Sequence, residues 1–123
     1  ATIKAGRQKE LLLGDTSAER DWGDARDTVR GMWLALQHDT AADYIFATGK
    51  LHAVQDIVNL AFTTVDLNAV DYIKRDERFM RPAEPTRLLG NPARAKEHLG
   101  WEAGTTFEAL IREMTEAEMN ALA

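Results

Sequence analysis

The stretch Asp24–His38, DARDTVRGMWLALQH, decides the fold of this chain. Its large apolar residues recur at the i, i+3, i+4 and i+7 spacing that lines one face of an α-helix. They are Val29, Met32, Trp33 and Leu36. Asp24 and Asp27 stand in the first turn, where the helix dipole favours negative charge. The stretch therefore predicts an amphipathic helix.

Apolar stretches on both sides of this helix predict short strands. Leu11–Leu13, closed by Gly14, is too short to complete a helical stripe. Asp43–Thr48 is rich in aromatic and β-branched residues and ends at Gly49, which is typical of a buried strand. Residues 15–23, between the first strand and the helix, are predicted to be loop.

A second amphipathic helix follows Gly49. Its apolar face consists of Val54, Ile57, Val58, Ala61, Phe62 and Val65. Beyond this helix, Val70–Ile73 predicts a short strand. Residues 74–90 mix charge, proline and isolated leucines, and predict an extended segment.

The last third of the chain predicts two more helices. Asn91 is expected to cap a short helix, with Pro92 as its first residue and Gly100 at its end. A capping box at Thr105–Glu108 is expected to open the final helix. The apolar stripe of that helix is Phe107, Leu110, Ile111 and Met114.

Together these elements predict one α/β domain over residues 1–123, with about four helices and three or four short strands. The pattern is too irregular for a complete doubly wound sheet. Ala1–Lys9 is predicted to be the end of a helix, and the chain starts without Met. We therefore expect a piece of a larger protein.

Composition excludes several classes of protein. The 123 residues include 15 Lys and Arg, 20 Asp and Glu and no Cys, for a net charge of -5. The lack of Cys excludes a disulfide scaffold, a thiolate metal site and a cysteine nucleophile. No apolar run approaches the roughly 20 residues that cross a bilayer. We expect a cytoplasmic protein without membrane contact, and the acidic final helix argues against nucleic-acid binding.

Self-contained catalytic, cofactor and metal motifs are missing from the sequence. Its eight glycines are never spaced as G-x-G-x-x-G or as a phosphate loop. His38, His52 and His98 stand singly, without the spacing of metal ligands, and are predicted to be surface or capping residues. We assign no catalytic, cofactor-binding or metal-binding residue to this chain.

Basic residues gather between positions 74 and 96, where seven cationic residues face three acidic ones. The cationic residues are Lys74, Arg75, Arg78, Arg81, Arg87, Arg94 and Lys96. Arginine suits bidentate contact with phosphate oxygens, so an anion site is one interpretation. A salt-bridged, solvated surface is the other.

Arg81 and Glu84 lie three residues apart with a proline between them. Such a pair can hold a phosphate with the guanidinium and two ribose hydroxyls with the carboxylate. Arg20 is a second candidate, in a loop before a helix N-terminus. Asp21, Asp24 and Asp27 oppose a phosphate on that helix, so Arg20 would have to reach away from it.

Several motifs, in this order, resemble the C-terminal half of the GDP-mannose 4,6-dehydratases of the extended short-chain dehydrogenase/reductase superfamily. The motifs are IKAG (3–6), LLLG (11–14), RDWGDARD (20–27), ATG (47–49), RFMRPAE (78–84) and AKEHLGW (95–101). The resemblance spans essentially the whole chain.

The resemblance implies an NADP-dependent lyase that converts GDP-mannose to GDP-4-keto-6-deoxymannose and is a homo-oligomer at full length. Its N-terminal Rossmann lobe, missing from this chain, would hold NADP and the catalytic residues. In the C-terminal lobe, Arg20 and Arg81 would hold the diphosphate and Glu84 the ribose. The Lys9–Leu13 stretch, with Lys9 and Leu11, would border the guanine. Alone, this chain is expected to be inactive.

The chain departs from the family pattern at two places. Ala53 stands where a serine usually follows the histidine, which removes an expected side-chain N-cap. Pro85-Thr86 replaces the usual Val-Asp after Glu84, which puts a strand there in doubt. Two alternatives stay open: a GDP-sugar reductase or epimerase of the same superfamily, and a non-catalytic, degenerate module that kept the fold.

Overall fold

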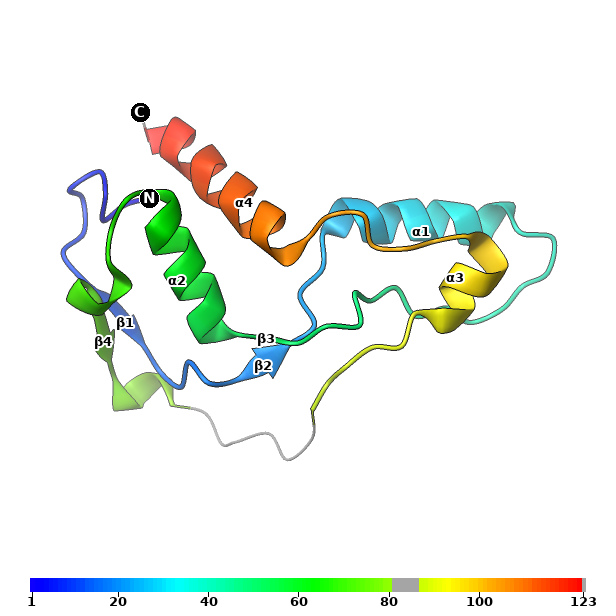
Figure 1. Ribbon diagram of the computed structural model, residues 1–123, viewed down its shortest axis with the longest axis horizontal. Helices are drawn as coiled ribbons and strands as arrows, with labels where there is room; N and C mark the ends of the chain where they lie inside the picture. The colour runs from blue at the N-terminus through cyan, green and yellow to red at the C-terminus, as the bar shows by residue number, and fades with distance from the viewer. Residues whose placement is uncertain (81–86, 123) are drawn as a thin grey trace.

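Four α-helices and four short strands form the described part of the chain, residues 1–80 and 87–122 of a computed structural model (Figure 1). The strands are β1 (Leu11–Leu13), β2 (Glu19–Arg20), β3 (His52–Ala53) and β4 (Ile73–Arg75). The helices are α1 (Ala25–Gln37), α2 (Val54–Thr64), α3 (Ala93–Leu99) and α4 (Phe107–Leu122), with 3₁₀ turns η1 (Ala69–Asp71) and η2 (Glu77–Phe79). The predicted α/β chain is thus confirmed. Within the described residues, no helix combines the length and apolarity needed to cross a membrane.

One half of the molecule, here called the body, consists of β1, β4, α2 and α4. β1 and β4 pair in parallel, with Leu11 opposite Ile73. Val58, Phe62 and Ala69 form the buried centre, and residues from both strands pack against it. Residues of β1, β4 and α2 thus share one small core, and α4 contacts α2.

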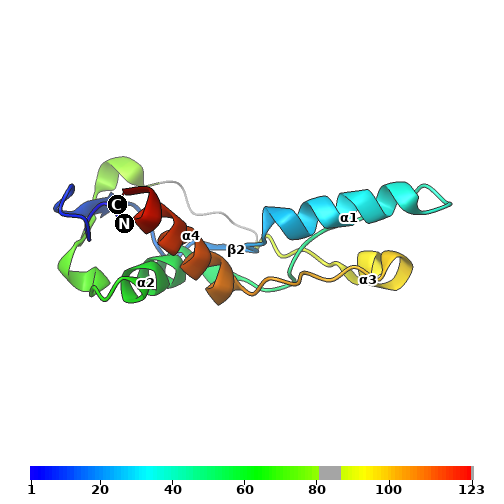
Figure 2. The ribbon, with the colours of Figure 1, turned by 90° about the horizontal axis from the view of Figure 1, so that it is seen from above.

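The other half, here called the arm, consists of α1, α3 and the loops beside them, and projects away from the body (Figure 2). Trp101 is 1% exposed at its centre and donates a hydrogen bond from Nε1 to the Asp27 carbonyl at 2.8 Å. The Phe46 ring meets Trp101 edge to face, with 5.0 Å between centroids. A Cβ on Gly31 would lie 2.5 Å from the Phe46 ring, so only glycine lets α1 approach these rings.

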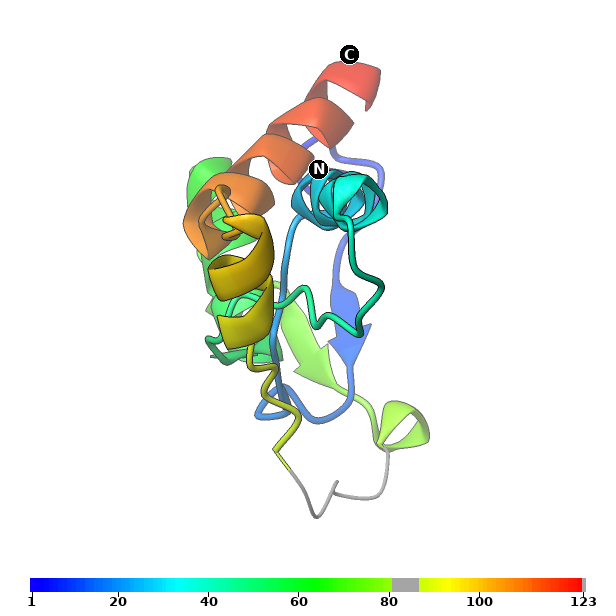
Figure 3. The same cartoon turned by 90° about the vertical axis from the view of Figure 1, so that its right-hand side faces the viewer.

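A short antiparallel ladder connects the two halves. β2 pairs with β3, with Glu19 opposite Ala53 and Arg20 opposite His52. Figure 3 views the molecule from the arm end, with α1 and α3 in front and β1 and β4 behind them. The ladder lies where arm and body meet, so residues on β2 are held by both.

The four helices predicted after residue 23 are confirmed, with changes at two helix starts. Asp24 caps α1, and Gly100, at φ 62°, ends α3. Pro92 is the N-cap of α3 rather than its first residue, although the Asn91 side chain accepts a hydrogen bond from Ala93 N at 3.0 Å. α2 begins after Ala53, as expected without a side-chain cap.

At the starts of α2 and α4, a side-chain oxygen accepts a hydrogen bond from a backbone N–H group. The Asp56 carboxylate accepts a hydrogen bond from Ala53 N at 2.8 Å, which satisfies one of the free N–H groups at the start of α2. At the start of α4, Thr106 accepts from Ala109 N at 3.2 Å. The predicted capping box at Thr105–Glu108 is therefore wrong by one residue.

Four other predictions about local structure are wrong in whole or in part. Ala1–Lys9 forms turns rather than a helix, and Gly6 there adopts a left-handed conformation at φ 70°. Asp43–Thr48 forms no strand and pairs with no described strand. The loop predicted over residues 15–23 contains β2. The predicted strand at Val70–Ile73 is correct only from Ile73 onward, because η1 occupies the residues before it.

Candidate functional site

Arg20 lies at the junction of arm and body. It is half-buried on β2, opposite His52 of β3, and its Nη1 donates to the Glu19 carbonyl at 2.6 Å. Trp22 Nε1 donates to the His52 carbonyl at 3.2 Å, so the chain on both sides of Arg20 is tied to β3. The guanidinium is therefore carried by a fixed stretch of backbone.

Asp21 binds two distant loops. Its Oδ1 accepts from Thr48 N at 2.9 Å and from the Thr48 hydroxyl. Its Oδ2 accepts from Gly49 N at 2.9 Å and from Gly90 N at 3.4 Å. A Cβ on Gly90 would lie 2.2 Å from the Ala47 Cβ, so the N–H of residue 90 reaches Asp21 because that residue is glycine.

The predicted clamp residues Arg81 and Glu84 lie outside the described residues, but the described chain before and after them contacts the stretch between β1 and Arg20. On one side, Arg87 forms an ion pair with Glu19 at 2.8 Å. On the other, the Phe79 carbonyl comes so close to Gly14 that a Cβ there would lie 2.1 Å from it. Both anchors belong to the short stretch that leads from β1 to Arg20.

Lys9 and Leu11, predicted to border a guanine, lie at the start of β1. Lys9 is exposed, whereas Leu11 is half-buried and packs against the core of the body. Leu11 also lines a cavity of about 170 Å³, whose other walls include Ile3, Phe62 and Leu67. The described residues therefore give Leu11 a packing role, and a contact with guanine stays a prediction.

The basic stretch between residues 74 and 96 is partly neutralised. Lys74, Arg78, Arg87 and Lys96 form ion pairs with Glu10, Asp76, Glu19 and Glu102 respectively. The hydrogen bonds that Arg78 donates lower the pKa of Asp76. The salt-bridged interpretation therefore holds for these four residues, and the anion-site interpretation depends on the others.

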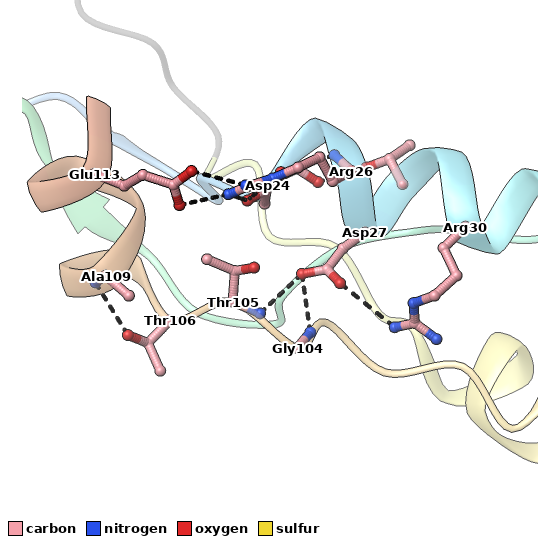
Figure 4. A network of polar contacts seen from close by, with 10 residues as sticks. Asp24, Arg26, Asp27, Arg30, Gly104, Thr105, Thr106, Ala109 and Glu113 are labelled. Atoms are coloured by element: carbon pink, nitrogen blue, oxygen red, sulfur yellow. Dashed lines mark hydrogen bonds and ion pairs between the residues drawn. The ribbon is translucent and has the colours of Figure 1, made fainter. Parts of the chain in front are cut away.

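The start of α1 is closed to phosphate by its own carboxylates (Figure 4). Asp24 is 4% exposed and accepts from Arg26 N at 2.7 Å. Hydrogen bonds from the Arg26 side chain and backbone lower the pKa of Asp24 to about 2. Arg26 also binds Glu113 of α4 at 2.7 Å. A phosphate here would meet the ionised carboxylates of Asp24 and Glu113. This supports the expectation that Arg20 reaches away from this helix.

Asp27 holds the loop that leads into α4. Its Oδ2 accepts from Gly104 N at 2.9 Å and from Thr105 N at 2.8 Å (Figure 4). Burial raises the pKa of Asp27, but hydrogen bonds from the Thr105 and Gly104 backbone and from Arg30 outweigh it, so the net shift is downward. Asp27 therefore resembles Asp21 in chemistry but serves a different part of the molecule.

The other cavity and side-chain groups of the described residues are less suited to bind an anion or a metal ion than the surroundings of Arg20. A cavity of about 300 Å³ opens beside Thr48 and Trp101, but its cation, Lys96, is paired with Glu102. His52, one of the histidines predicted to be surface or capping residues, is half-buried and stacks on the Phe107 ring, with 3.8 Å between centroids. Among residues 1–80 and 87–122, no group of three or more His, Cys, Asp and Glu is arranged to hold a metal ion.

Sequence reasoning found Arg20 but missed the residues that hold it. Glu19 and Asp21 flank Arg20 and bind Arg87 and Gly90, in the described segment that follows the predicted clamp. The alternation of acidic, basic and acidic residues around position 20 was the available signal, because alternate residues of a strand share a face.

The sequence comparisons with known proteins point to one family. Residues 1–114 match the sequence profile of the GDP-mannose 4,6 dehydratase family. "GDP-mannose 4,6 dehydratase 2" of Arabidopsis thaliana is 42% identical over 117 residues, which cover 95% of this chain and 31% of that protein. The chain thus spans about a third of the length of this curated relative.

Solved structures support the fold. The structure of RMD from Pseudomonas aeruginosa complexed with NADPH matches with a TM-score of 0.86 at 25% identity, over 98% of this chain and 39% of that one. A dTDP-glucose 4,6-dehydratase from Bacillus anthracis, in complex with NAD, matches with a TM-score of 0.81 at 21% identity, over 97% and 37% of the two chains. The second match bears on the fold alone.

Proposed function

Since this chain belongs to the GDP-mannose 4,6-dehydratase family, we propose that it supplies the GDP-sugar-binding part of an enzyme that converts GDP-mannose to GDP-4-keto-6-deoxymannose. The observation that carries the proposal is the family match over residues 1–114, which includes Arg20 and both flanks of Arg81 and Glu84. Arg20 and Arg81 hold the diphosphate, Glu84 holds the ribose, and Lys9 and Leu11 border the guanine.

The geometry around Arg20 supports this assignment. Arg20 sits on a short ladder that both halves of the molecule hold, so its position costs little further ordering when a ligand binds. The ion pair between Arg87 and Glu19 holds residue 87 beside the same strand. A pair of guanidinium groups suits the two phosphates of a nucleoside diphosphate.

In this proposal the chain contributes binding energy rather than bond chemistry. Contacts to the GDP moiety, remote from the reacting hexose, orient the sugar against catalytic groups in the rest of the enzyme. The nicotinamide cofactor, which we propose to be NADP, supplies hydride transfer when bound. None of the eight glycines here forms a dinucleotide loop, so we assign the cofactor to the Rossmann lobe of the longer enzyme. We further propose a cytoplasmic, homo-oligomeric enzyme.

The test uses the full-length enzyme with Arg20→Ala and Arg81→Ala, and Arg112→Ala as the control. Arg112 lies on the exposed side of α4, and its replacement by alanine removes the same charge at a position outside the proposed clamp. Arg20→Ala and Arg81→Ala should each raise the KM for GDP-mannose about tenfold or more, because each removes a charge-assisted contact. The control should match the parent enzyme. Clamp variants with an unchanged KM would overturn the assignment.

Product analysis separates the alternatives. A dehydratase releases a 4-keto-6-deoxy sugar nucleotide from GDP-mannose, whereas a GDP-sugar reductase or epimerase leaves the 6-hydroxyl in place on that substrate. A degenerate module would bind no GDP in calorimetry. The 42% identity to a dehydratase favours the first outcome.

A further inference from the structure

Asp21 forms more cross-chain hydrogen bonds than a surface carboxylate needs. Thr48 and Gly49 donate to it from a loop 27 and 28 residues further along the chain, and Gly90 donates from 69 residues away. Three of these donors are backbone N–H groups. Asp21 therefore fixes how three separate segments of chain meet.

We propose that Asp21 is a positioning residue for Arg20, an inference that rests on the proposed function. Neighbouring residues of an extended chain direct their side chains to opposite faces. Glu19 and Asp21 both bind the segment 87–90, so they share one face and Arg20 is directed to the other. Fixing Asp21 on its face therefore sets the face of the chain from which the Arg20 side chain extends.

The chemistry of the site requires a carboxylate. An ionised carboxylate offers about four acceptor positions and no donor, which matches four donors converging on it. Asparagine would present an NH₂ group to backbone N–H donors, so at least one of the contacts would be lost. The Asp21 contacts would then loosen, and the backbone that carries Arg20 would loosen with them.

A purely structural role is the alternative, and Asp27 provides its matched control. Asp27 also accepts two backbone hydrogen bonds from a distant loop, at Gly104 and Thr105. Neither Gly104 nor Thr105 belongs to β2, to β3 or to residues 87–90. Both carboxylates should thus matter for stability, and only Asp21 should matter for the placement of Arg20.

The experiment measures kcat, the KM for GDP-mannose and the Tm of the full-length enzyme with Asp21→Asn or Asp27→Asn. Asp21→Asn should raise KM about tenfold or more with little change in kcat, because a misplaced clamp weakens ground-state and transition-state binding alike. Asp27→Asn should lower Tm while leaving KM close to that of the parent enzyme. Equal KM values for the two variants would overturn the proposal.

Thr48 gives a milder second test if Asp21→Asn does not fold. Thr48→Val removes one donor to Asp21, whereas Thr48→Ser keeps it. Thr48→Val should raise KM and Thr48→Ser should restore it; a parental KM for Thr48→Val would contradict the positioning role. Arg20→Ala separates the two proposals. If it raises KM and the Asp21 and Thr48 variants do not, only the positioning role fails, whereas an unchanged KM for Arg20→Ala overturns the clamp itself.

Discussion

At the scale of single residues, ionised aspartates hold the loops of this chain together. Asp21, Asp24 and Asp27 lie within seven consecutive residues, and each accepts a backbone N–H. Backbone N–H groups in loops need acceptors, and hydrogen bonds to a charged acceptor are stronger than those to a neutral one. The arm and its junction with the body therefore depend on these carboxylates.

Stability should consequently fall in acid. The pKa of Asp24 is about 2 in the folded protein against 3.8 for the unperturbed group, so its contribution is complete above about pH 4 and is lost as the pH falls toward 2. Thermal unfolding of the full-length enzyme at pH 5, 4 and 3 should show Tm decreasing. Asp24→Asn should lower Tm at pH 5 and flatten this decrease. A decrease of the same size in both proteins would contradict the role of Asp24.

Sequence reasoning reached only the local part of these roles. Asp24 was predictable because its partner, Arg26, is two residues away in the first turn of a recognisable helix. Asp27 binds Thr105, 78 residues further along, and no periodicity or spacing reports such a contact. Arg20 could be selected as a candidate by residue type, but the residues that position it could not.

At the scale of elements, hydrophobic periodicity predicts a helix correctly without showing what covers its apolar face. The stripe predicted on α1 is present, yet its residues remain 53% to 82% exposed. They are Val29, Met32, Trp33 and Leu36. The face of α1 toward Trp101 is instead the one that carries Gly31. The predicted strand at Asp43–Thr48 fails similarly, because a strand needs a hydrogen-bonded neighbour and no described strand pairs with it.

An exposed apolar stripe of this kind promotes self-association of the isolated chain. The double substitution Trp33→Ser with Leu36→Ser should raise the monomer fraction in sedimentation velocity, because it removes two of the largest exposed apolar side chains. Gln37→Ser on the same helix is the control and should change nothing. If the double variant associates as strongly as the parent chain, the stripe is not the cause.

α2 lacks a side-chain cap at a place where the chain can accept one. Ala53 is the N-cap, and Asp56 already supplies the reciprocal hydrogen bond to Ala53 N. Ala53→Ser adds an acceptor for a free N–H of the first turn and should stabilise the protein by about 1 kcal/mol. Urea unfolding of the full-length enzyme measures this gain. Ala109→Ser inside α4 is the control and should bring no gain; a neutral or destabilising Ala53→Ser would show that the cap position is already satisfied.

At the scale of the whole molecule, the described residues form two small hydrophobic clusters rather than one core, and Arg20 lies between them. Phe62 centres the cluster of the body, and Trp101 centres that of the arm. The β2–β3 ladder and the ion pair between Arg26 and Glu113 join the two. Any ligand held by Arg20 therefore contacts the junction, so binding and the relative placement of the halves are linked.

The most direct test of the account is the affinity of the full-length enzyme for GDP, measured by isothermal titration calorimetry with and without Arg20→Ala. GDP carries the phosphates and ribose that the clamp is assigned to hold and lacks the hexose on which the chemistry occurs. We expect Arg20→Ala to weaken GDP binding about tenfold or more, with a smaller dependence on salt. Equal affinities of the parent enzyme and Arg20→Ala would contradict the assignment of this chain as the diphosphate-binding part.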